Sequence, residues 1–304
     1  MRVGVNLINF GPGASGSSLL QWAKIAEDIG YHSAMISDHV ALTADVRIKY
    51  PEPFYDAFAT LSWLAGQTRR IKIGTTVVVV PYRHPALLAR LGANLDDLSG
   101  GRFILGVGVG GMPLEYAALG LAFHERGAIA NEYLAAIEVL WTSETASFQG
   151  KHVAFTDIAG IRSLQRPHPP IWVGGRSDAA LRRAVRFGDA WHPNHISLEW
   201  LRTTGLPRLR TFAERAGRPV PALAPRIAME VTDAALPEET RQVGQGRLDQ
   251  VRRDVEALHA LGATHVLLDR YTGDLEATRD HEAGWRTLEL LAGKVFDLER
   301  ETLR

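Results

Sequence analysis

The stretch from Ile71 to Gly111 constrains the fold more than any other part of the chain. Its first part, Ile71–Val80, is rich in β-branched residues and lacks alternation of apolar and polar positions, as in a parallel strand buried on both faces. Leucines at helical spacing follow Pro85, and Phe103–Val109 predicts a second buried strand that runs into glycine. Because a helix returns the chain between them, we expect the two strands to be parallel. The glycine-rich end of such a strand is a usual ligand position in α/β folds.

The same strand–helix pattern recurs along the whole chain of 304 residues. The predicted strands are Val3–Ile8, Ser33–Ser37, Ile71–Val80, Phe103–Val109, Pro169–Gly175, Gly188–Pro193, Arg226–Val231 and Thr264–Asp269. Eight strands with intervening helices predict an α/β fold, a (β/α)8 TIM barrel with insertions. An open doubly wound sheet is the competing fold, but the count of eight and the lack of a mid-chain linker favour the barrel.

We expect one TIM-barrel domain over residues 1–304, with an insertion after the fourth strand at about residues 112–165. Within it, Thr145–Phe155 carries Gln149-Gly150-Lys151 at its centre and predicts a β-hairpin, which would serve as a lid over the site or as an interface.

Composition excludes several classes of function. Lys plus Arg and Asp plus Glu number 34 each, so global charge does not favour nucleic acid or an anionic membrane as partner. The absence of cysteine excludes disulfides, thiolate nucleophiles and zinc–thiolate sites, and is compatible with a reducing cytosol. The N-terminus enters a predicted strand at once, and no apolar run reaches the length of a membrane span. We therefore expect a cytoplasmic protein with a small-molecule substrate.

Two groups of residues at predicted strand ends could carry chemistry. Asp38 and His39 follow the second strand, where a neutral imidazole can exchange a proton near pH 7; a histidine that caps a loop is the alternative. Gly174-Gly175-Arg176-Ser177 lies between the fifth strand and a helix, where free N–H groups suit a phosphate; an ordinary turn is the alternative. His192 and His195 lack a carboxylate partner at convincing spacing, so we expect no metal site.

Five motifs together resemble the luciferase-like monooxygenase superfamily, and within it the branch that uses the deazaflavin coenzyme F420. These motifs are Ser37-Asp38-His39-Val40, Pro81-Tyr82-Arg83-His84-Pro85, Leu98-Ser99-Gly100-Gly101-Arg102, Leu105-Gly106-Val107-Gly108-Val109-Gly110 and Pro169-Pro170-Ile171-Trp172-Val173-Gly174-Gly175. The resemblance spans nearly the whole chain. It implies a TIM barrel, usually a homodimer, with a flavin-type ring at the C-terminal mouth of the barrel.

The resemblance also implies roles for individual residues. His39 would be a cofactor contact and the catalytic acid or base, with Asp38 beside it, and Thr76-Val77 would form a non-proline cis peptide in a bulge behind the ring. The remaining cofactor contacts would be Gly106, Gly108, Gly110, Gly174, Gly175, Arg176 and Ser177. One departure concerns the substrate: the sugar-phosphate dehydrogenase relatives carry an acid where this chain has Gly111, and Glu115 follows only later. A hexose phosphate is therefore not the favoured substrate.

The primary hypothesis from sequence is an F420-dependent oxidoreductase that exchanges a hydride with an organic substrate. An FMN-dependent monooxygenase is the sister alternative, because both branches place a histidine near this position. A carrier or sensor that binds a flavin or deazaflavin without turnover is the alternative from another class. A phosphate-binding isomerase or aldolase barrel would need a lysine or glutamate at a strand end, where only Glu230 is available.

Overall fold

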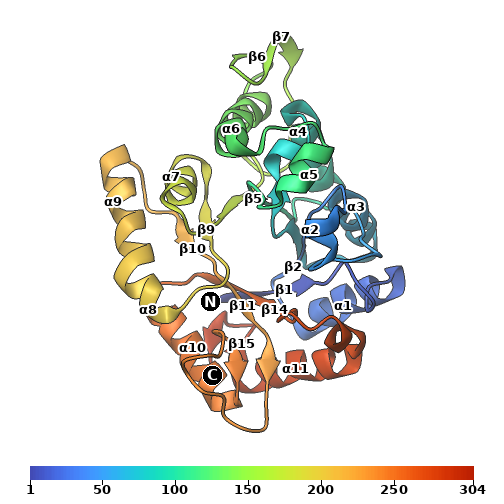
Figure 1. The fold of residues 1–304 in the computed structure, drawn as a ribbon, viewed down its shortest axis with the longest axis vertical. Helices are drawn as coiled ribbons and strands as arrows, with labels where there is room; N and C mark the ends of the chain where they lie inside the picture. The colour runs from blue at the N-terminus through green and yellow to red at the C-terminus, as the bar shows by residue number, and fades with distance from the viewer.

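A curled sheet of parallel strands forms the centre of the molecule, and helices surround it (Figure 1). The computed structural model describes residues 1–304. The strands of the central sheet are β1 (Arg2–Leu7), β2 (Ser33–Ile36), β3 (Lys72–Thr75), β4 (Val78–Val79), β5 (Phe103–Gly108), β8 (Ile171–Gly174), β9 (Ala190–His192), β10 (Ala222–Leu223), β11 (Arg226–Ala228) and β14 (His265–Asp269). Their order is β10-β9-β8-β5-β3-β2-β1-β14-β11, and β4 pairs with β5.

The two ends of this strand order meet in one short segment, Ala222–Ala228. Its first half, β10, pairs with β9, and its second half, β11, pairs with β14. Pro225 separates the halves; it has no N–H to give to the ladder, but its carbonyl accepts a hydrogen bond from Leu267 N at 2.9 Å. The sheet therefore curls back on itself, which confirms the predicted α/β fold of the TIM-barrel type.

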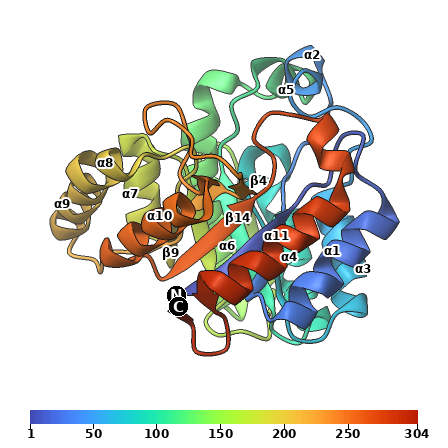
Figure 2. The same cartoon turned by 90° about the horizontal axis from the view of Figure 1, so that it is seen from below.

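The larger helices lie outside the sheet, as Figures 1 and 2 show. They are α1 (Gly16–Ile29), α3 (Ala57–Gln67), α4 (Pro85–Leu98), α6 (Arg126–Thr142), α7 (Asp178–Phe187), α9 (Leu206–Ala216), α10 (Leu248–Ala260) and α11 (His281–Lys294). Their apolar faces and the outward strand residues form the larger core, whereas a smaller cluster fills the inside of the sheet with Met35, Ile104, Trp172, Ala190, Ala224 and Leu267. None of the helices combines the length and apolar composition needed to cross a bilayer.

The third strand is interrupted, as predicted from the sequence. Thr76-Val77 is a cis peptide between β3 and β4. Two glycines of β5 make room for this bulge: a Cβ at Gly106 would lie 1.8 Å from Thr75 O, and one at Gly108 would lie 2.6 Å from Val77 Cγ2. The predicted cis bulge is confirmed, and β5 needs glycine at both positions for packing.

The seventh strand is shorter than predicted at its end. The sequence predicts Arg226–Val231, but the sheet strand stops at Ala228, and β12 (Glu230–Val231) pairs instead with β13 (Gln245–Gly246). Glu230 N donates to Gly244 O at 3.4 Å, and the Glu230 side chain accepts a hydrogen bond from Gln245 Nε2 at 2.7 Å. The strand ends early because the loop after it folds back, so that β13 pairs with β12. This contact joins residues distant in the chain, and no local sequence pattern predicts it.

The region from residue 112 to residue 165 contains several kinds of element. The short helices α2 (Ala44–Arg47) and α5 (Pro113–Ala118) pack together near the strand ends, and α6 lies beside α4 and α7 in the outer ring. The predicted hairpin is confirmed: β6 (Thr145–Gln149) pairs antiparallel with β7 (Ala154–Ala159) and projects from the body (Figure 1). The remaining short elements are α8 (Leu198–Trp200), β15 (Phe296–Asp297), β16 (Thr302–Leu303) and the helical turns η1 (Val80–Tyr82), η2 (Phe123–Glu125), η3 (Leu201–Gly205) and η4 (Glu276–Arg279).

Candidate active site

A cavity of about 550 Å³ opens at the carboxyl ends of the strands. Residues that directly follow β2, β3, β9 and β14 line it, because parallel strands all end at this face of the sheet. Its volume lies within the range of small-molecule and cofactor sites, about 300–1,000 Å³. The lining includes five of the residues predicted from sequence: Asp38, His39, Thr76, Val77 and Gly110.

His39 lies in this cavity with one ring nitrogen engaged. Nδ1 is 2.7 Å from Oε2 of Glu115, and the side chain is 12% exposed. The Tyr50 ring stacks on the imidazole at 5.0 Å between centroids with a 27° angle between planes. Phe54 meets it edge-on at 5.6 Å. The imidazole is thus held on three sides, and Nε2 is the nitrogen available to a bound molecule.

Glu115, on α5, is the residue that sequence reasoning missed as the partner of His39. Its buried carboxylate also accepts hydrogen bonds from Val40 N at 2.7 Å, Ala41 N at 3.1 Å and Tyr82 Oη at 2.9 Å. Burial acts to raise the pKa of Glu115, but the hydrogen bonds from His39 and the two amides outweigh it, so the pKa lies below its usual range. The only signal in the sequence is an acid shortly after the glycine-rich strand end.

Asp38 is adjacent to His39 in sequence but has a different partner. Its two carboxylate oxygens accept one hydrogen bond each, at 2.8 Å, from the two terminal nitrogens of Arg83, and Oδ2 also accepts from Val79 N at 3.0 Å. Arg83 further pairs with Asp56 at 3.0 Å. Asp38 therefore ties β4 and the following turn to the end of β2.

His192 is buried beside the bulge and supports it. Its Nε2 is 2.8 Å from Thr76 Oγ1, and its Nδ1 is 2.5 Å from Ala224 O. Burial lowers the pKa of His192 to about 4, so the ring is neutral at pH 7. Because a carbonyl can only accept, Nδ1 carries the hydrogen, and the Thr76 hydroxyl donates to Nε2.

Arg226 joins the bulge to the opposite wall. Its Nη1 donates to Thr76 O at 2.9 Å, and its Nε donates to Asp269 Oδ2 at 2.8 Å. The other oxygen of Asp269 accepts from Asn6 Nδ2 at 2.8 Å and from Tyr271 N at 3.1 Å. Both oxygens of Asp269 therefore accept hydrogen bonds, and Arg226 holds the carbonyl of Thr76 in place.

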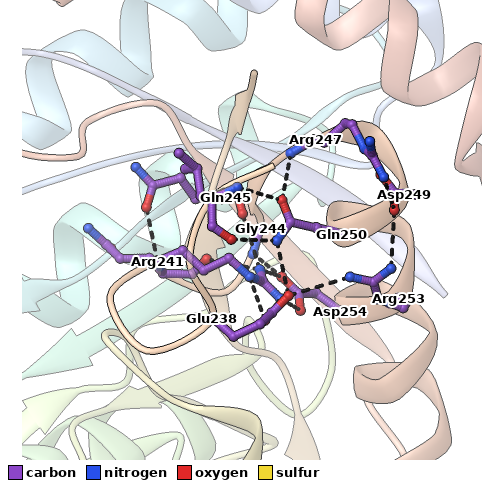
Figure 3. Close-up of polar contacts among 11 residues, drawn as sticks. Glu238, Arg241, Gly244, Gln245, Arg247, Asp249, Gln250, Arg253 and Asp254 are labelled. Carbon is purple, nitrogen blue, oxygen red and sulfur yellow. Dashed lines mark hydrogen bonds and ion pairs between the residues drawn. The ribbon is translucent and has the colours of Figure 1, made fainter. Parts of the chain in front are cut away.

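A side chamber of about 190 Å³ adjoins the cavity, and the two share Asn194, His195, Arg226, Gln242, Asp269 and Tyr271. Part of its wall is the loop that carries Arg241 and Gln242. Figure 3 shows how this loop is held against α10: Arg241 donates to both oxygens of Asp254, at 2.5 and 2.8 Å, and Gly244 N donates to Asp254 at 2.8 Å. A buried ion pair outside the cavity thus sets the position of the chamber wall.

The predicted glycines do not all reach the cavity. Gly110 lines it, as does Gly111, where a Cβ would meet nothing within 4 Å. Gly106 and Gly108 instead pack against Thr75 and Val77, and the cavity lining does not include them.

The predicted phosphate turn lies beside the cavity and outside its lining. Gly174 contacts Val77, where an added Cβ would be 3.2 Å from Cγ1, and Gly175 has a φ of 102°. Ser177 caps α7 by accepting from Ala180 N. Arg176 donates a hydrogen bond to the carbonyl of His195. The turn is exposed at a helix N-terminus, as the sequence analysis expects, but Arg176 is already bound to a neighbouring loop.

Comparisons with known proteins match a family model, sequence relatives and solved structures to this chain. The family model described as Luciferase-like monooxygenase matches residues 1–293. The chain is 35% identical over 231 residues to an F420-dependent glucose-6-phosphate dehydrogenase of Nakamurella multipartita, covering 73% of this chain and 64% of that protein. It is 33% identical over 213 residues to an uncharacterised protein of Mycobacterium tuberculosis, covering 66% and 72%. The crystal structure of monooxygenase RslO1 from Streptomyces bottropensis superimposes with a TM-score of 0.76 at 23% identity, covering 96% of this chain and 98% of that one.

Proposed function

We propose that this chain, which belongs to the luciferase-like monooxygenase family, is an oxidoreductase that uses coenzyme F420 to exchange a hydride with a small organic substrate. The observation that carries the proposal is His39, whose Nε2 faces a cavity bounded by the bulged main chain at Thr76-Val77. The F420-dependent relative at 35% identity favours the deazaflavin over other ring cofactors.

The cavity residues fit a flat tricyclic ring. Gly110 and Gly111 leave one part of the wall free of side chains, and the cavity of about 550 Å³ can hold such a ring together with a small substrate. His39, Thr76, Val77 and Gly110 would hold the ring. The turn at Gly174–Ser177, which lies at a helix N-terminus, would take the anionic tail. When bound, the deazaflavin supplies the hydride chemistry.

The protein's own contribution is orientation and a proton site. When a substrate alcohol is oxidised to a carbonyl, the hydroxyl proton needs an acceptor, and Nε2 of His39 can take it. In the reverse direction the same atom returns the proton to the carbonyl oxygen. Tyr50 and Phe54 hold the imidazole plane, so little reorientation is needed for this transfer. We propose a substrate other than a hexose phosphate, because Gly111 stands where the resemblance predicts an acid in the sugar-phosphate enzymes.

Cofactor titration tests the proposal. Purified protein is titrated separately with F420 and with FMN, and binding is followed by cofactor fluorescence. We expect F420 to bind at least about tenfold more tightly, a difference of about 1.4 kcal/mol. Tighter binding of FMN, with oxygen consumption on reduction, would favour the monooxygenase for which the family is named. Tight F420 binding without turnover across a panel of alcohols and carbonyl compounds would favour a carrier or sensor.

We also propose that the protein forms a homodimer through α3 and α4. These neighbouring helices carry three partly exposed large apolar side chains: Trp63 at 41%, Leu87 at 51% and Leu98 at 69%. A second copy of the chain would cover them. Light scattering after size exclusion tests this proposal, and a monomer mass at micromolar concentration would reject it.

A further inference from the structure

We infer that Glu115 is a positioning residue that fixes the tautomer of His39, so that Nε2 faces the cavity without a hydrogen. Oε2 of Glu115 lies 2.7 Å from Nδ1 of His39. An ionised carboxylate can only accept hydrogen bonds, so Nδ1 must carry the hydrogen. In a neutral imidazole the other nitrogen is then an acceptor. The activity consequences of this inference rest on the proposed function, whereas the tautomer itself does not.

The surroundings of Glu115 keep it ionised. The side chain is fully buried, and every donor around it points a hydrogen at its oxygens: Val40 N and Ala41 N on Oε1, Tyr82 Oη on Oε2. A protonated acid would have to give up one of these hydrogen bonds. Burial and the charge of Glu115 raise the pKa of Tyr82, so the phenol stays protonated and remains a donor.

Neither of the carboxylates that line the cavity can take this role. Asp38 is held by Arg83 through both oxygens, and Asp269 is held by Arg226, Asn6 and the Tyr271 amide. The titratable and charged groups near His39 on its own side of the cavity are Glu115 on α5, Tyr82 after β4, Tyr50 and Lys49 after α2, and the Asp38–Arg83 pair. Across the cavity lie His195, Tyr271 and the Arg226–Asp269 pair. Glu115 is the one anion among them in hydrogen-bond contact with the imidazole.

The segment after β5 thus contributes a side chain that contacts His39. Glu115 reaches His39 because α5 packs on α2, where Leu114 N donates to Asp45 Oδ2 at 3.1 Å. The dyad joins residues that lie 76 positions apart in the chain. This carboxylate–imidazole pair leaves His39 ready to accept a proton and stabilises the imidazolium that then forms.

Nitrogen NMR of histidine-labelled protein tests the tautomer directly, without cofactor or substrate. For the neutral ring, read at the high-pH plateau of the shifts, we expect the His39 resonances of a protonated Nδ1 and an unprotonated Nε2, assigned by their loss in His39→Asn. In Glu115→Gln, the amide can donate to Nδ1, and we expect the protonated nitrogen to become Nε2. A neutral wild-type His39 ring whose hydrogen lies on Nε2 would overturn the inference, whatever the cofactor proves to be.

Activity measurements supply the second arm. Glu115→Gln should lower kcat/KM at least about tenfold and shift its acidic limb to lower pH by about one unit, because the imidazolium loses its anionic partner. Cofactor affinity should stay within about twofold. The matched control is Glu27→Gln, a buried carboxylate that accepts from Arg69 N at 2.8 Å and Ile71 N at 3.0 Å, at the opposite ends of the strands. Equal losses in the two variants, or an unmoved pH profile in Glu115→Gln, would overturn the positioning role.

Discussion

At the scale of single residues, the acids near the cavity are distinguished by their partners and not by their positions in the chain. Asp38 is the neighbour of His39 in sequence, yet Arg83 occupies both of its oxygens. Glu115, on a short helix, is the acid that contacts the imidazole. The presence of His39 at a strand end could be predicted, because strand ends follow from local patterns. Its partner could not, because the position of α5 depends on packing.

Replacement of His39 should affect turnover far more than stability. In His39→Ala the cavity loses its proton site, and we expect kcat/KM to fall by about 10²- to 10⁴-fold. The change in Tm should be a few degrees, because Glu115 keeps three other donors. His84→Ala is the matched control: Nδ1 of His84 caps α4 by accepting from Ala86 N at 3.2 Å, and His84 does not line the cavity. A fall in the Tm of His39→Ala large enough to account for its loss of activity would contradict this role.

Two glycines, one within β5 and one shortly after it, should differ sharply in their tolerance of a methyl group. Gly106→Ala would place a Cβ 1.8 Å from Thr75 O, and backbone must move to relieve the clash. We expect a loss of at least about 2 kcal/mol in the free energy of unfolding. Gly111→Ala meets nothing within 4 Å and should cost little stability. Urea unfolding of the two variants measures the difference, and similar midpoints would show that the bulge does not require glycine.

At the scale of elements, the local signals located the predicted strands to within a few residues. α7 (Asp178–Phe187) begins directly after the Gly174–Ser177 turn, where the sequence predicts a helix, because its cap Ser177 and its apolar spacing are local features. The division of the seventh strand at Pro225 and its early end at Ala228 were not predicted. Both depend on the strands and the loop that pair with it, which are distant in the chain.

One buried ion pair, Arg241–Asp254, should stabilise the loop that forms part of the side-chamber wall. Asp254→Asn leaves the Arg241 guanidinium, 7% exposed, without its main anionic partner, and we expect a loss of about 3 kcal/mol in the free energy of unfolding. Asp249→Asn, on the same helix, breaks pairs with Arg247 and Arg253 that are about half exposed, and should change the free energy of unfolding much less. Figure 3 shows both sites. Comparable urea midpoints for the two variants would contradict this assignment.

At the scale of the whole molecule, neutral histidines lie along the axis of the sheet. His32 and His265 face each other at the amino ends of the strands with ring centroids 5.2 Å apart, and Trp172 lies between His265 and His192. Burial lowers the pKa of His32 to about 4, that of His265 to about 3 and that of His192 to about 4. Each ring is therefore expected to stay neutral in the folded chain at pH values where an unfolded chain protonates it.

Stability should consequently fall as the pH is lowered from about 6.5 to about 5. The unfolded chain binds up to one more proton per histidine than the folded chain across this window, so the free energy of unfolding decreases. The limiting slope is about 1.4 kcal/mol per pH unit for each histidine. Carboxylates such as Glu115 and Glu27 contribute only at lower pH. Urea midpoints at pH 7.5, 6 and 5 measure the effect, and a constant midpoint over that range would contradict it.

The sequence by itself determined the order and type of the strands and helices, the curled parallel sheet, and the cavity end at which Asp38, His39 and Thr76 lie. These follow from hydrophobic period, caps and glycine, which act within a few residues of one another. Only the tertiary structure decided that Glu115 pairs with His39, that Arg83 engages Asp38, and that Gly106 and Gly108 serve packing. Such pairings depend on how side chains from separate elements fill one space, and no local pattern records that arrangement.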